Sequence, residues 1–354
     1  MAGKGLVAAI KYGVVGVVVA VALGQGRLLF TLALRATSGP LDLVVGTLPG
    51  INEAELARSA SGKSFLVVGG TRGIGRGIVT AIVRLGGSCT IVGRRGAAAR
   101  AREVVASPGR VFVGHDVDLS TVAGCVALSD ALSADGREFD VVVFTVGAWP
   151  NFSDPTTTDG LERVLQLDLL ARHLVLKRLA RDDLLSEGAV VVNTLASTVM
   201  MPFVSKIGVK VRLERSRPPA TLATSLPPIA VAADAYLLAA ATHLPARITY
   251  VGMFPGVVNT DVMLSTFPAW AVAILHALQR PISISEDETA LTHLAVAMSP
   301  NCRRRRVSYW NYLLEARATH RLAYEADLAD FVWNFLETTS ARLAPPPDQA
   351  AAIP

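Results

Sequence analysis

The chain has 354 residues, enough for one large domain or two ordinary ones, and 51% of them are apolar against 18% charged. This composition supplies a sizeable core and favours contact with a membrane. The net charge of +5 is modest, and no basic stripe with interleaved aromatic residues is present, so we expect no nucleic acid partner. Three scattered cysteines show neither metal-ligand spacing nor a disulfide framework. We therefore expect no metal site, and either a reducing compartment or buried thiols.

Residues 1–36 differ in character from the rest of the chain. No acidic residue occurs before Asp42, and the stretch from Tyr12 to Gly26 is uncharged. This stretch is shorter than the about 20 apolar residues of a membrane span, but Lys11 and Arg27 could lengthen it by placing their charges at the two interfaces. The pattern favours a retained transmembrane anchor over a secretory signal peptide or an organelle presequence. We expect contact with membrane lipid, with the mitochondrial inner membrane favoured over the endoplasmic reticulum.

After this anchor, residues 37–62 contain Gly, Pro and Ser and predict a linker with one short helix. From residue 63 to 342, strand and helix patterns alternate, which predicts one doubly wound parallel α/β sheet of the Rossmann type. Residues 343–354 predict an extended tail. The expected strands are Phe65–Gly69, Cys89–Gly93, Arg110–Gly114, Asp140–Thr145, Ala189–Thr194 and Ile248–Met253. The expected helices lie near Arg76–Leu85, Ala97–Val105, Val122–Leu132, Leu161–Leu185 and Ile229–His243.

The run from Phe65 to Gly77, FLVVGGTRGIGRG, carries the clearest motif in the chain. Gly69, Gly73 and Gly75 lie between a buried strand and a helix with an apolar period. Side chains at these positions would keep the backbone away from a pyrophosphate, whereas the free N–H groups of the helix N-terminus attract such an anion. The run therefore predicts a dinucleotide site.

Three arginines decide which dinucleotide this site favours. Arg94 and Arg95 follow the second strand, nineteen residues beyond Gly75, and Arg72 lies inside the glycine turn. An acidic residue after the second strand would bond a ribose 2′-hydroxyl, whereas arginine pairs with a 2′-phosphate. The sequence thus favours NADP(H) over NAD(H); the alternative is that Arg94 and Arg95 are simply solvated.

Two further positions complete the predicted cofactor site. Asp118, after the third strand, could bond the adenine amino group, cap the helix that starts near Ser120, or do both. Gly147, just past the fourth strand, leaves room for the cofactor backbone.

These residues resemble the motifs of the short-chain dehydrogenase/reductase family. Gly69-x-x-x-Gly73-Ile74-Gly75 is similar to its glycine motif, and Asp118-Leu119-Ser120 to its adenine-contacting segment. The segment Pro255-Gly256-Val257-Val258-Asn259-Thr260-Asp261 resembles the one that contacts the nicotinamide end. Leu328–Leu336 is like the closing helix of retinol-dehydrogenase-type members. The resemblance covers roughly residues 63–340 and implies the family's fold and a cofactor-contacting role for Ile74, Leu119, Pro255 and Gly256.

The catalytic pattern of the family is not matched. Asp168 stands where the family has a catalytic asparagine, and the catalytic serine corresponds to Ala196 or Ser197. The Tyr-x-x-x-Lys pair would begin near Ser225, where neither residue occurs. Hydride transfer to a carbonyl needs a proton donor, so an active enzyme would have to recruit another group. The candidates are Ser197, Asp168, Tyr236, Lys206 and Lys210, although Tyr236 also has the spacing of a core residue.

Two segments near this region are unusual. Residues 201–228 form a basic insert, in which the prolines at 218, 219, 227 and 228 are expected to prevent a continuous helix. We expect the insert to be a docking surface for another chain rather than a lid. The stretch Val262–Leu278 is strongly apolar, which suggests a lipophilic substrate, a membrane contact or a protein interface.

Together these features favour a membrane-anchored NADP(H)-binding protein that acts as a non-catalytic accessory subunit of a membrane complex, with protein partners. The alternative is an active NADPH-dependent oxidoreductase of a lipophilic carbonyl or alcohol with a non-standard proton donor. Regulation by NADP(H) occupancy, without turnover, is the third hypothesis.

Overall fold

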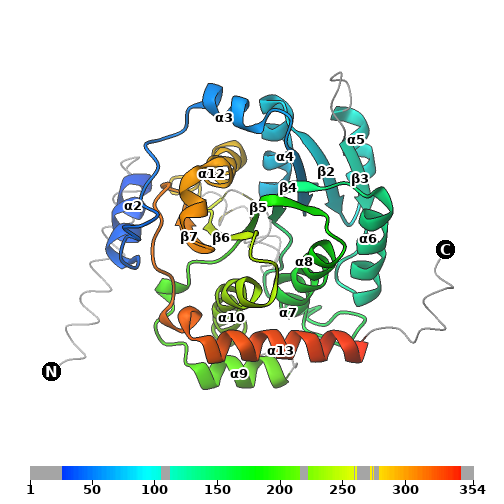
Figure 1. Cartoon of the computed structure of the whole chain (residues 1–354). Helices are drawn as coiled ribbons and strands as arrows, with labels where there is room; N and C mark the ends of the chain where they lie inside the picture. The colour runs from blue at the N-terminus through cyan, green and yellow to red at the C-terminus, as the bar shows by residue number, and fades with distance from the viewer. Residues whose placement is uncertain are drawn as a thin grey trace.

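A computed structural model describes residues 26–104, 112–215, 222–258, 260, 272, 274 and 279–343. Its centre is a seven-stranded parallel sheet with the strand order β3-β2-β1-β4-β5-β6-β7 (Figure 1). This confirms the predicted doubly wound fold. The strands are β1 (Ser64–Val68), β2 (Ser88–Gly93), β3 (Phe112–Asp116), β4 (Phe139–Phe144), β5 (Leu185–Thr194), β6 (Thr249–Phe254) and β7 (Val307–Asn311).

Helices cover both faces of the sheet. One face carries α3 (Glu53–Ala60), α4 (Gly73–Leu85), α5 (Ala97–Val104) and α12 (Glu286–Met298). The other carries α6 (Val122–Asp135), α7 (Arg163–Leu165), the π-helical turn η1 (Gln166–Leu170), α8 (Ala171–Arg181), α10 (Leu222–His243) and α13 (Ala326–Leu343). Outside these layers lie α2 (Gly26–Thr37) and α9 (Lys206–Arg215), and the described residues also contain the 3₁₀ turns η2 (Thr198–Met200), η4 (Pro300–Arg304) and η5 (Arg321–Tyr324).

Each strand divides its side chains between two separate cores, because successive residues point to opposite faces. In β1, Leu66 and Val68 join the core under α6, α8 and α10, whereas Phe65 and Val67 join the core under α4 and α12. All four side chains are fully buried. The near-continuous Val and Ile runs of the sequence therefore reflect a sheet covered on both sides, as expected for parallel strands.

Several element boundaries differ from the sequence-based expectations. The helix expected over Leu161–Leu185 ends at Arg181, and Leu185 opens β5. The insert contains the helix α9 after the non-helical residues 201–205, and α10 begins at Leu222, before the expected Ile229, so that Pro227 and Pro228 lie inside it. Both prolines lie beyond the first turn, where each removes a backbone hydrogen bond of the helix, so the packing of α10 in the core outweighs this local cost.

α10 also contains a membrane-like stretch. Among the described residues, one helical segment, Thr224–His243, is long and apolar enough to cross a bilayer, but 83% of its most apolar window is buried inside the protein. It is therefore best understood as the central helix of one core. The expected N-terminal anchor is a different segment: residues 1–25 lie outside the described part of the chain, and the remainder forms α2.

Residues 37–62 were expected to be a linker with one short helix, and α3 is that helix. The segment before α3 lies alongside the residues that come after β7. Antiparallel bridges join Leu41 to Arg317 and Thr47 to Glu315. Val45 is fully buried there. This part of the chain is therefore packed against the domain. The tail after Leu343 lies outside the described residues.

Candidate dinucleotide site

The glycine turn lies between β1 and α4, at the point where the strand order reverses and where open α/β sheets bind ligands. Gly69 has φ +101°, and a Cβ there would lie 2.6 Å from Thr145 Oγ1 and 2.7 Å from the Val146 nitrogen. A Cβ on Gly75 would lie 2.2 Å from the Gly69 oxygen. Any side chain at Gly69 would thus clash with the loop after β4 and push the glycine turn away from it.

The N-terminus of α4 is open to an anion. The residue before the helix is Arg72, and its side chain makes no capping hydrogen bond. Gly73, the first helical residue, has φ +53°. Ile74 is partly buried and packs its side chain against the core under α4. The uncapped N–H groups and the helix dipole therefore favour a pyrophosphate at this point.

The three arginines expected to select a 2′-phosphate lie at this turn or just after β2. Arg72, Arg94 and Arg95 are exposed, and none forms a hydrogen bond or ion pair within the described part of the chain. A Cβ on Gly93 would lie 2.5 Å from Thr71 Cγ2, so the end of β2 touches the glycine turn. Nearby basic residues are already paired: Arg76 with Glu286 at 2.8 Å and Arg100 with Glu103 at 3.1 Å.

The segment after β3 is only partly as expected. Asp118 is exposed and accepts a hydrogen bond from the Ser120 nitrogen at 3.0 Å. α6 begins at Val122 and is capped by Thr121, which accepts from the Gly124 nitrogen at 3.0 Å, so the capping role expected for Asp118 was wrong. Leu119 is 5% exposed, so its side chain belongs to the core.

The loop after β6 reaches the glycine turn. Pro255 is buried, and Gly256 has φ +78° with its Cβ position 2.8 Å from the Tyr312 ring. Further along, Thr260 Cγ2 lies 3.2 Å from the Cβ position of Gly73. The two motifs that are farthest apart in sequence thus meet in space. Most of Val262–Leu278 lies outside the described residues.

An ion pair between the buried Arg172 and the partly buried Asp168 lies at the ends of β4 and β5. Asp168, in η1, accepts a hydrogen bond from the Ala148 nitrogen at 3.2 Å and lies 3.7 Å from the Arg172 guanidinium. A Cβ on Gly147 would lie 2.4 Å from Asp168 Oδ1, so this glycine makes room for the carboxyl group. Burial raises the pKa of Asp168 to about 7, although Arg172 acts in the opposite direction. A π-helical turn at such a carboxyl group is typical of functional sites.

Arg172 was missed by the sequence-based analysis. It donates to the backbone oxygens of Val146 at 2.7 Å and Thr194 at 3.1 Å, which holds together the loops after β4 and β5. Its position four residues after Asp168 on a helix could have indicated the pair.

Ser197 lines a small cavity beyond the carboxyl ends of β5, β6 and β7. Its hydroxyl makes no hydrogen bond to another described residue. Asp234, from α10, lies in the same cavity wall and accepts hydrogen bonds from the hydroxyls of Thr198 and Thr319. Burial raises the pKa of Asp234 to about 7. No local pattern indicated Asp234, because its hydrogen-bond partners come from distant segments.

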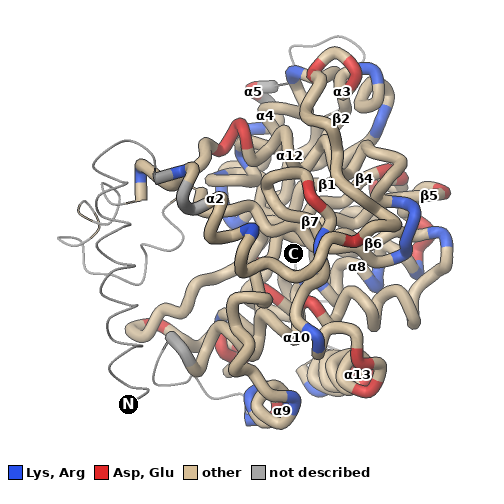
Figure 2. The backbone as a smooth tube through the Cα atoms, turned by 90° about the vertical axis from the view of Figure 1, so that its left-hand side faces the viewer, with Lys and Arg blue, Asp and Glu red and all other residues tan. Residues whose placement is uncertain are grey.

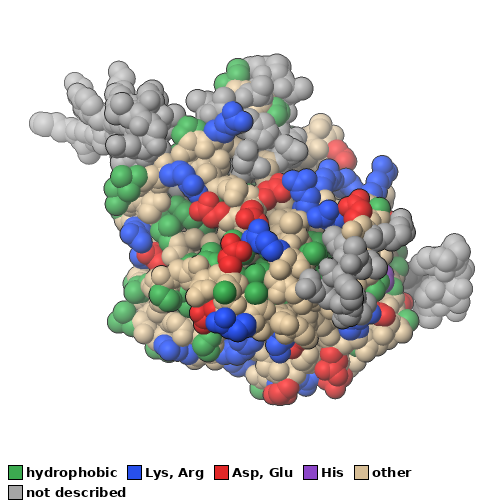
Figure 3. Space-filling view, turned by 90° about the horizontal axis from the view of Figure 1, so that it is seen from above, with side chains coloured by type: hydrophobic (Ala, Val, Ile, Leu, Met, Phe, Trp, Pro, Cys, Tyr) green, Lys and Arg blue, Asp and Glu red, His purple; other side chains and the backbone are tan. Residues whose placement is uncertain are grey.

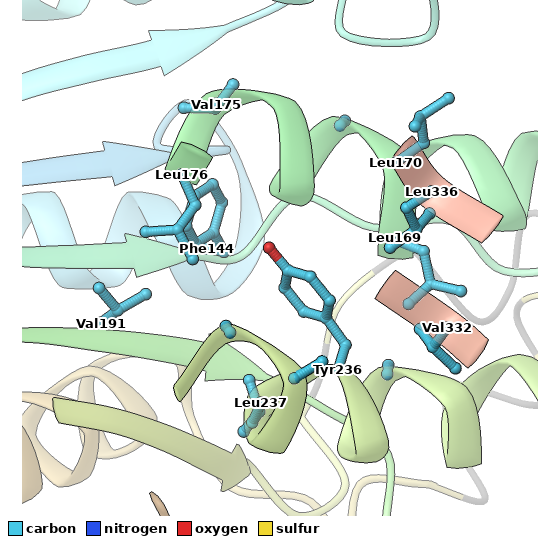
Figure 4. Close-up of a cluster of buried hydrophobic side chains, with 14 of the residues drawn as sticks. Phe144, Leu169, Leu170, Val175, Leu176, Val191, Tyr236, Leu237, Val332 and Leu336 are labelled. Carbon is cyan, nitrogen blue, oxygen red and sulfur yellow. The ribbon is translucent and has the colours of Figure 1, made fainter. Parts of the chain in front are cut away.

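Tyr236 lies apart from this cavity. Figure 4 shows its ring among Phe144, Leu169, Leu237 and Val332, deep in the core under α8, α10 and α13. It is 2% exposed, and burial raises the pKa of its hydroxyl well above the ordinary value. We therefore withdraw Tyr236 as a candidate proton donor.

Lys206 and Lys210 are also removed from the site. Both point from α9 to Asp327 at the start of α13, at 3.0 Å and 3.9 Å. α9 and α13 lie side by side at the bottom of Figures 1 and 2, and Figure 2 marks basic and acidic positions on this pair of helices.

Ser225, where a catalytic tyrosine was sought, is fully buried and donates to Glu162 at 2.7 Å. Glu162 also pairs with Arg212 of α9. Ile229, one helical turn after Ser225, is 1% exposed. This position of α10 therefore serves to attach the insert to the domain.

Comparison with known proteins supports the fold and the turn. A family model described as short chain dehydrogenase matches residues 63–207. L-fucose dehydrogenase from Mus musculus is 35% identical over 123 residues, 33% of this chain and 42% of that protein. The Bos taurus enzyme is 30% identical over 162 residues, 42% of this chain and 56% of that protein. The chain thus spans about half the length of the curated relatives it matches.

Solved structures share the fold at low identity. A short-chain dehydrogenase/reductase from Serratia marcescens has 17% identity and a TM-score of 0.52 over 72% of this chain and 97% of its own. The angucycline C-6 ketoreductase LanV, solved with bound NADP, has 18% identity and a TM-score of 0.53, over 72% of this chain and 95% of its own. A metagenomic blue fluorescent protein in complex with NADPH has 20% identity and a TM-score of 0.52, over 72% of this chain and 97% of its own. Residues 63–207 are therefore similar to the short-chain dehydrogenase family model, and the chain shares the fold of solved short-chain dehydrogenases/reductases.

Proposed function

We propose that this chain is a membrane-anchored NADP(H)-binding protein that acts as an accessory subunit of a membrane complex rather than as a dehydrogenase. The observation that carries the proposal is a contrast within one domain. The glycine cradle is sterically complete, whereas the α10 positions expected to carry a proton relay hold the buried side chains of Ser225 and Ile229.

The residues present fit NADP(H). A Cβ would fill the turn at Gly69 and Gly75, so the backbone is kept clear for a pyrophosphate, and Arg72, Arg94 and Arg95 lack partners among the described residues. The bound cofactors of LanV and of the metagenomic protein agree with this assignment. When bound, NADPH would supply a hydride; the chain itself would hold the phosphates and orient the ring.

A second candidate, an active oxidoreductase, is favoured by the cavity that contains Ser197 and Asp234. A carboxyl group that keeps its proton near neutral pH can act as a general acid, and the Ser197 hydroxyl could orient a carbonyl oxygen. Asp168, with a pKa raised to about 7, is the other such group. L-fucose is a substrate to test, because the curated relatives are named for it.

The deciding experiment is turnover by the purified full chain in detergent. NADPH oxidation would be followed with retinal and a steroid ketone, and NADP reduction with L-fucose. The accessory role predicts saturable NADPH binding without turnover above background for any of the three. Steady turnover that Asp234→Asn or Asp168→Asn abolishes would establish the second candidate instead.

A partner and a location are tested separately. Affinity purification of the tagged chain from detergent-solubilised membranes, with mass spectrometry, is expected to recover a defined set of membrane subunits. We place the complex in the mitochondrial inner membrane, with the endoplasmic reticulum as the alternative. Recovery of the chain alone, from the soluble fraction, would contradict both the partner and the membrane.

A further inference from the structure

The helix α2 turns its polar side chains toward the protein. Three of them contact the domain at successive turns: Arg27 pairs with Glu288 at 2.6 Å, Thr31 bonds Tyr312 at 3.1 Å, and Arg35 pairs with Glu315 at 2.9 Å. Leu34 is buried on the same side, at 2% exposure. Both arginines of α2 are therefore neutralised by carboxylates of the domain.

Among its described side chains, α2 also has an apolar face that is exposed. Leu28 is 56% exposed and Leu32 is 51% exposed, and the spacing of four residues places them on one face. Ala33 and Ala36 are also exposed. A helix on the surface of a protein in water normally presents the reverse pattern, with apolar residues inward and charged residues outward. α2 is thus inverted with respect to water.

The sequence next to α2 indicates what covers this face. The uncharged stretch from Tyr12 runs directly into α2, and no acidic residue precedes Asp42. With Arg27 and Arg35 both paired to the domain, no unpaired charge remains on the described side chains of α2. An uncharged apolar segment that continues as an outward apolar face matches the acyl region of a bilayer.

We propose that α2 lies along the membrane surface with Leu28 and Leu32 in contact with lipid acyl chains. The inference deepens the membrane anchoring of the proposed function and rests on it. The sequence suggested that Arg27 places its charge at the membrane interface. In the structure it pairs instead with Glu288 and so attaches α2 to α12. The domain and the bilayer would therefore hold a fixed orientation.

This orientation has a consequence for the small cavity. Leu34 and Ser38 of the α2 segment line it together with Ser197, Phe254 and Asn311, which follow or end β5, β6 and β7. In Figure 1, α2 lies at the side of the molecule next to β6 and β7. The carboxyl edge of the sheet would thus face the membrane, and a ligand of the cavity would be a lipophilic molecule that arrives from the bilayer.

The test uses the full chain in phosphatidylcholine vesicles that contain a minor fraction of phosphatidylglycerol. Cys89, Cys125 and Cys302 are buried, so a fluorescent maleimide can be directed to a cysteine introduced at an exposed position. The positions are Leu28→Cys and Leu32→Cys, with Glu187→Cys as a control near the amino end of β5. Lipids with a doxyl quencher on the acyl chain report contact with the bilayer, and flotation reports association of the whole protein.

We expect the protein to float and the doxyl lipid to lower emission at least several-fold more at positions 28 and 32 than at 187. Flotation with equal, weak quenching at all three positions would overturn the inference while leaving the anchor intact. Failure to float would refute the membrane anchoring itself. Labels at 28 and 32 that are shielded from water before vesicles are added would show that another protein surface, not lipid, covers α2.

Discussion

At the scale of single residues, we expect cofactor selectivity to depend on arginines that have no ion-pair partner among the described residues. Arg94 and Arg95 are exposed and unpaired within the described residues, unlike the neighbouring Arg100. A hydrogen bond to a charged group contributes about 1.5–3 kcal/mol, which is roughly 10- to 100-fold in affinity. We expect Arg94→Ala/Arg95→Ala to weaken NADPH binding by this factor and to leave NADH binding unchanged.

Fluorescence titration with both nucleotides measures this difference, and Arg181→Ala, at the distant end of α8, is the matched control. Equal losses for NADPH and NADH would mean that the two arginines do not contact a 2′-phosphate.

The contact between Gly147 and Asp168 gives a second prediction. A methyl group at position 147 would overlap Asp168 Oδ1, since the two positions are 2.4 Å apart. Overpacking of this kind costs about 1–3 kcal/mol. We expect Gly147→Ala to lower the free energy of unfolding by this amount in wild type and by much less in an Asp168→Ala background. Urea unfolding of the four proteins in the cycle measures the coupling; strictly additive effects would place the carboxyl group elsewhere.

At the scale of elements, the insert is held by a buried ion pair. Arg212 of α9 and Glu162 before α7 are 8% and 2% exposed, and Ser225 of α10 completes the network. Removal of one member of such a pair costs about 3–5 kcal/mol, because the other charge is left buried. We expect Arg212→Met to destabilise the protein by this order and to speed amide exchange in α9.

The control is Arg215→Met, at an exposed position of the same helix, which should stay within about 0.5 kcal/mol of wild type. If Arg212→Met behaves like this control, α9 is attached by its apolar contacts alone.

The comparison of sequence and structure also belongs to this scale. The glycine turn could be predicted because its reason is local: strand, turn and helix are consecutive, and the steric demand falls on Gly69 and Gly75. β7 and α12 were not predicted, although the run Val307–Asn311 has the aromatic and β-branched residues of a strand. α10 was expected to begin only at Ile229, after Pro227 and Pro228, but tertiary packing of the following turns outweighs the local cost of these prolines.

The side chains near the ends of β4 and β5 were harder to predict for a physical reason. Apart from the local pair of Arg172 with Asp168, the partners of Arg172 and Asp234 lie more than twenty residues away, and only the folded chain brings them together. Tyr236, by contrast, had the spacing of a core residue, and the structure places it in the core.

At the scale of the whole molecule, surface charge is mixed. The face in Figure 3 carries basic and acidic side chains side by side, with apolar ones between them. Several ion pairs join elements that are distant in sequence, such as Arg76 with Glu286 and Lys177 with Glu337. Exposed pairs of this kind contribute little individually, so stability depends on the two cores.

The buried carboxyl of Asp234 makes global stability depend on pH. Its pKa is about 7 in the folded protein and 3.8 as a free group, so between these values the folded state binds the extra proton. Stability from this group is therefore fully present below pH 3.8 and is lost as the pH rises through 7. At about 1.4 kcal/mol per pKa unit, wild type should lose roughly 3 kcal/mol between pH 5 and 8 through Asp234.

Asp234→Asn keeps an oxygen that accepts from Thr198 and Thr319 but has no proton to lose. We expect its free energy of unfolding to fall by about 3 kcal/mol less than that of wild type over this range. Urea unfolding at several pH values measures this, and parallel curves for the two proteins would show that Asp234 is ionised throughout.

The central claim is that the chain forms a nucleotide cradle that selects NADPH. The most direct measurement is titration of the unmodified full-length protein with NADPH and, separately, with NADH, followed by nucleotide fluorescence. Saturable binding with NADPH favoured by roughly tenfold or more is the predicted result. No saturable binding, or equal affinity for the two nucleotides, would contradict it.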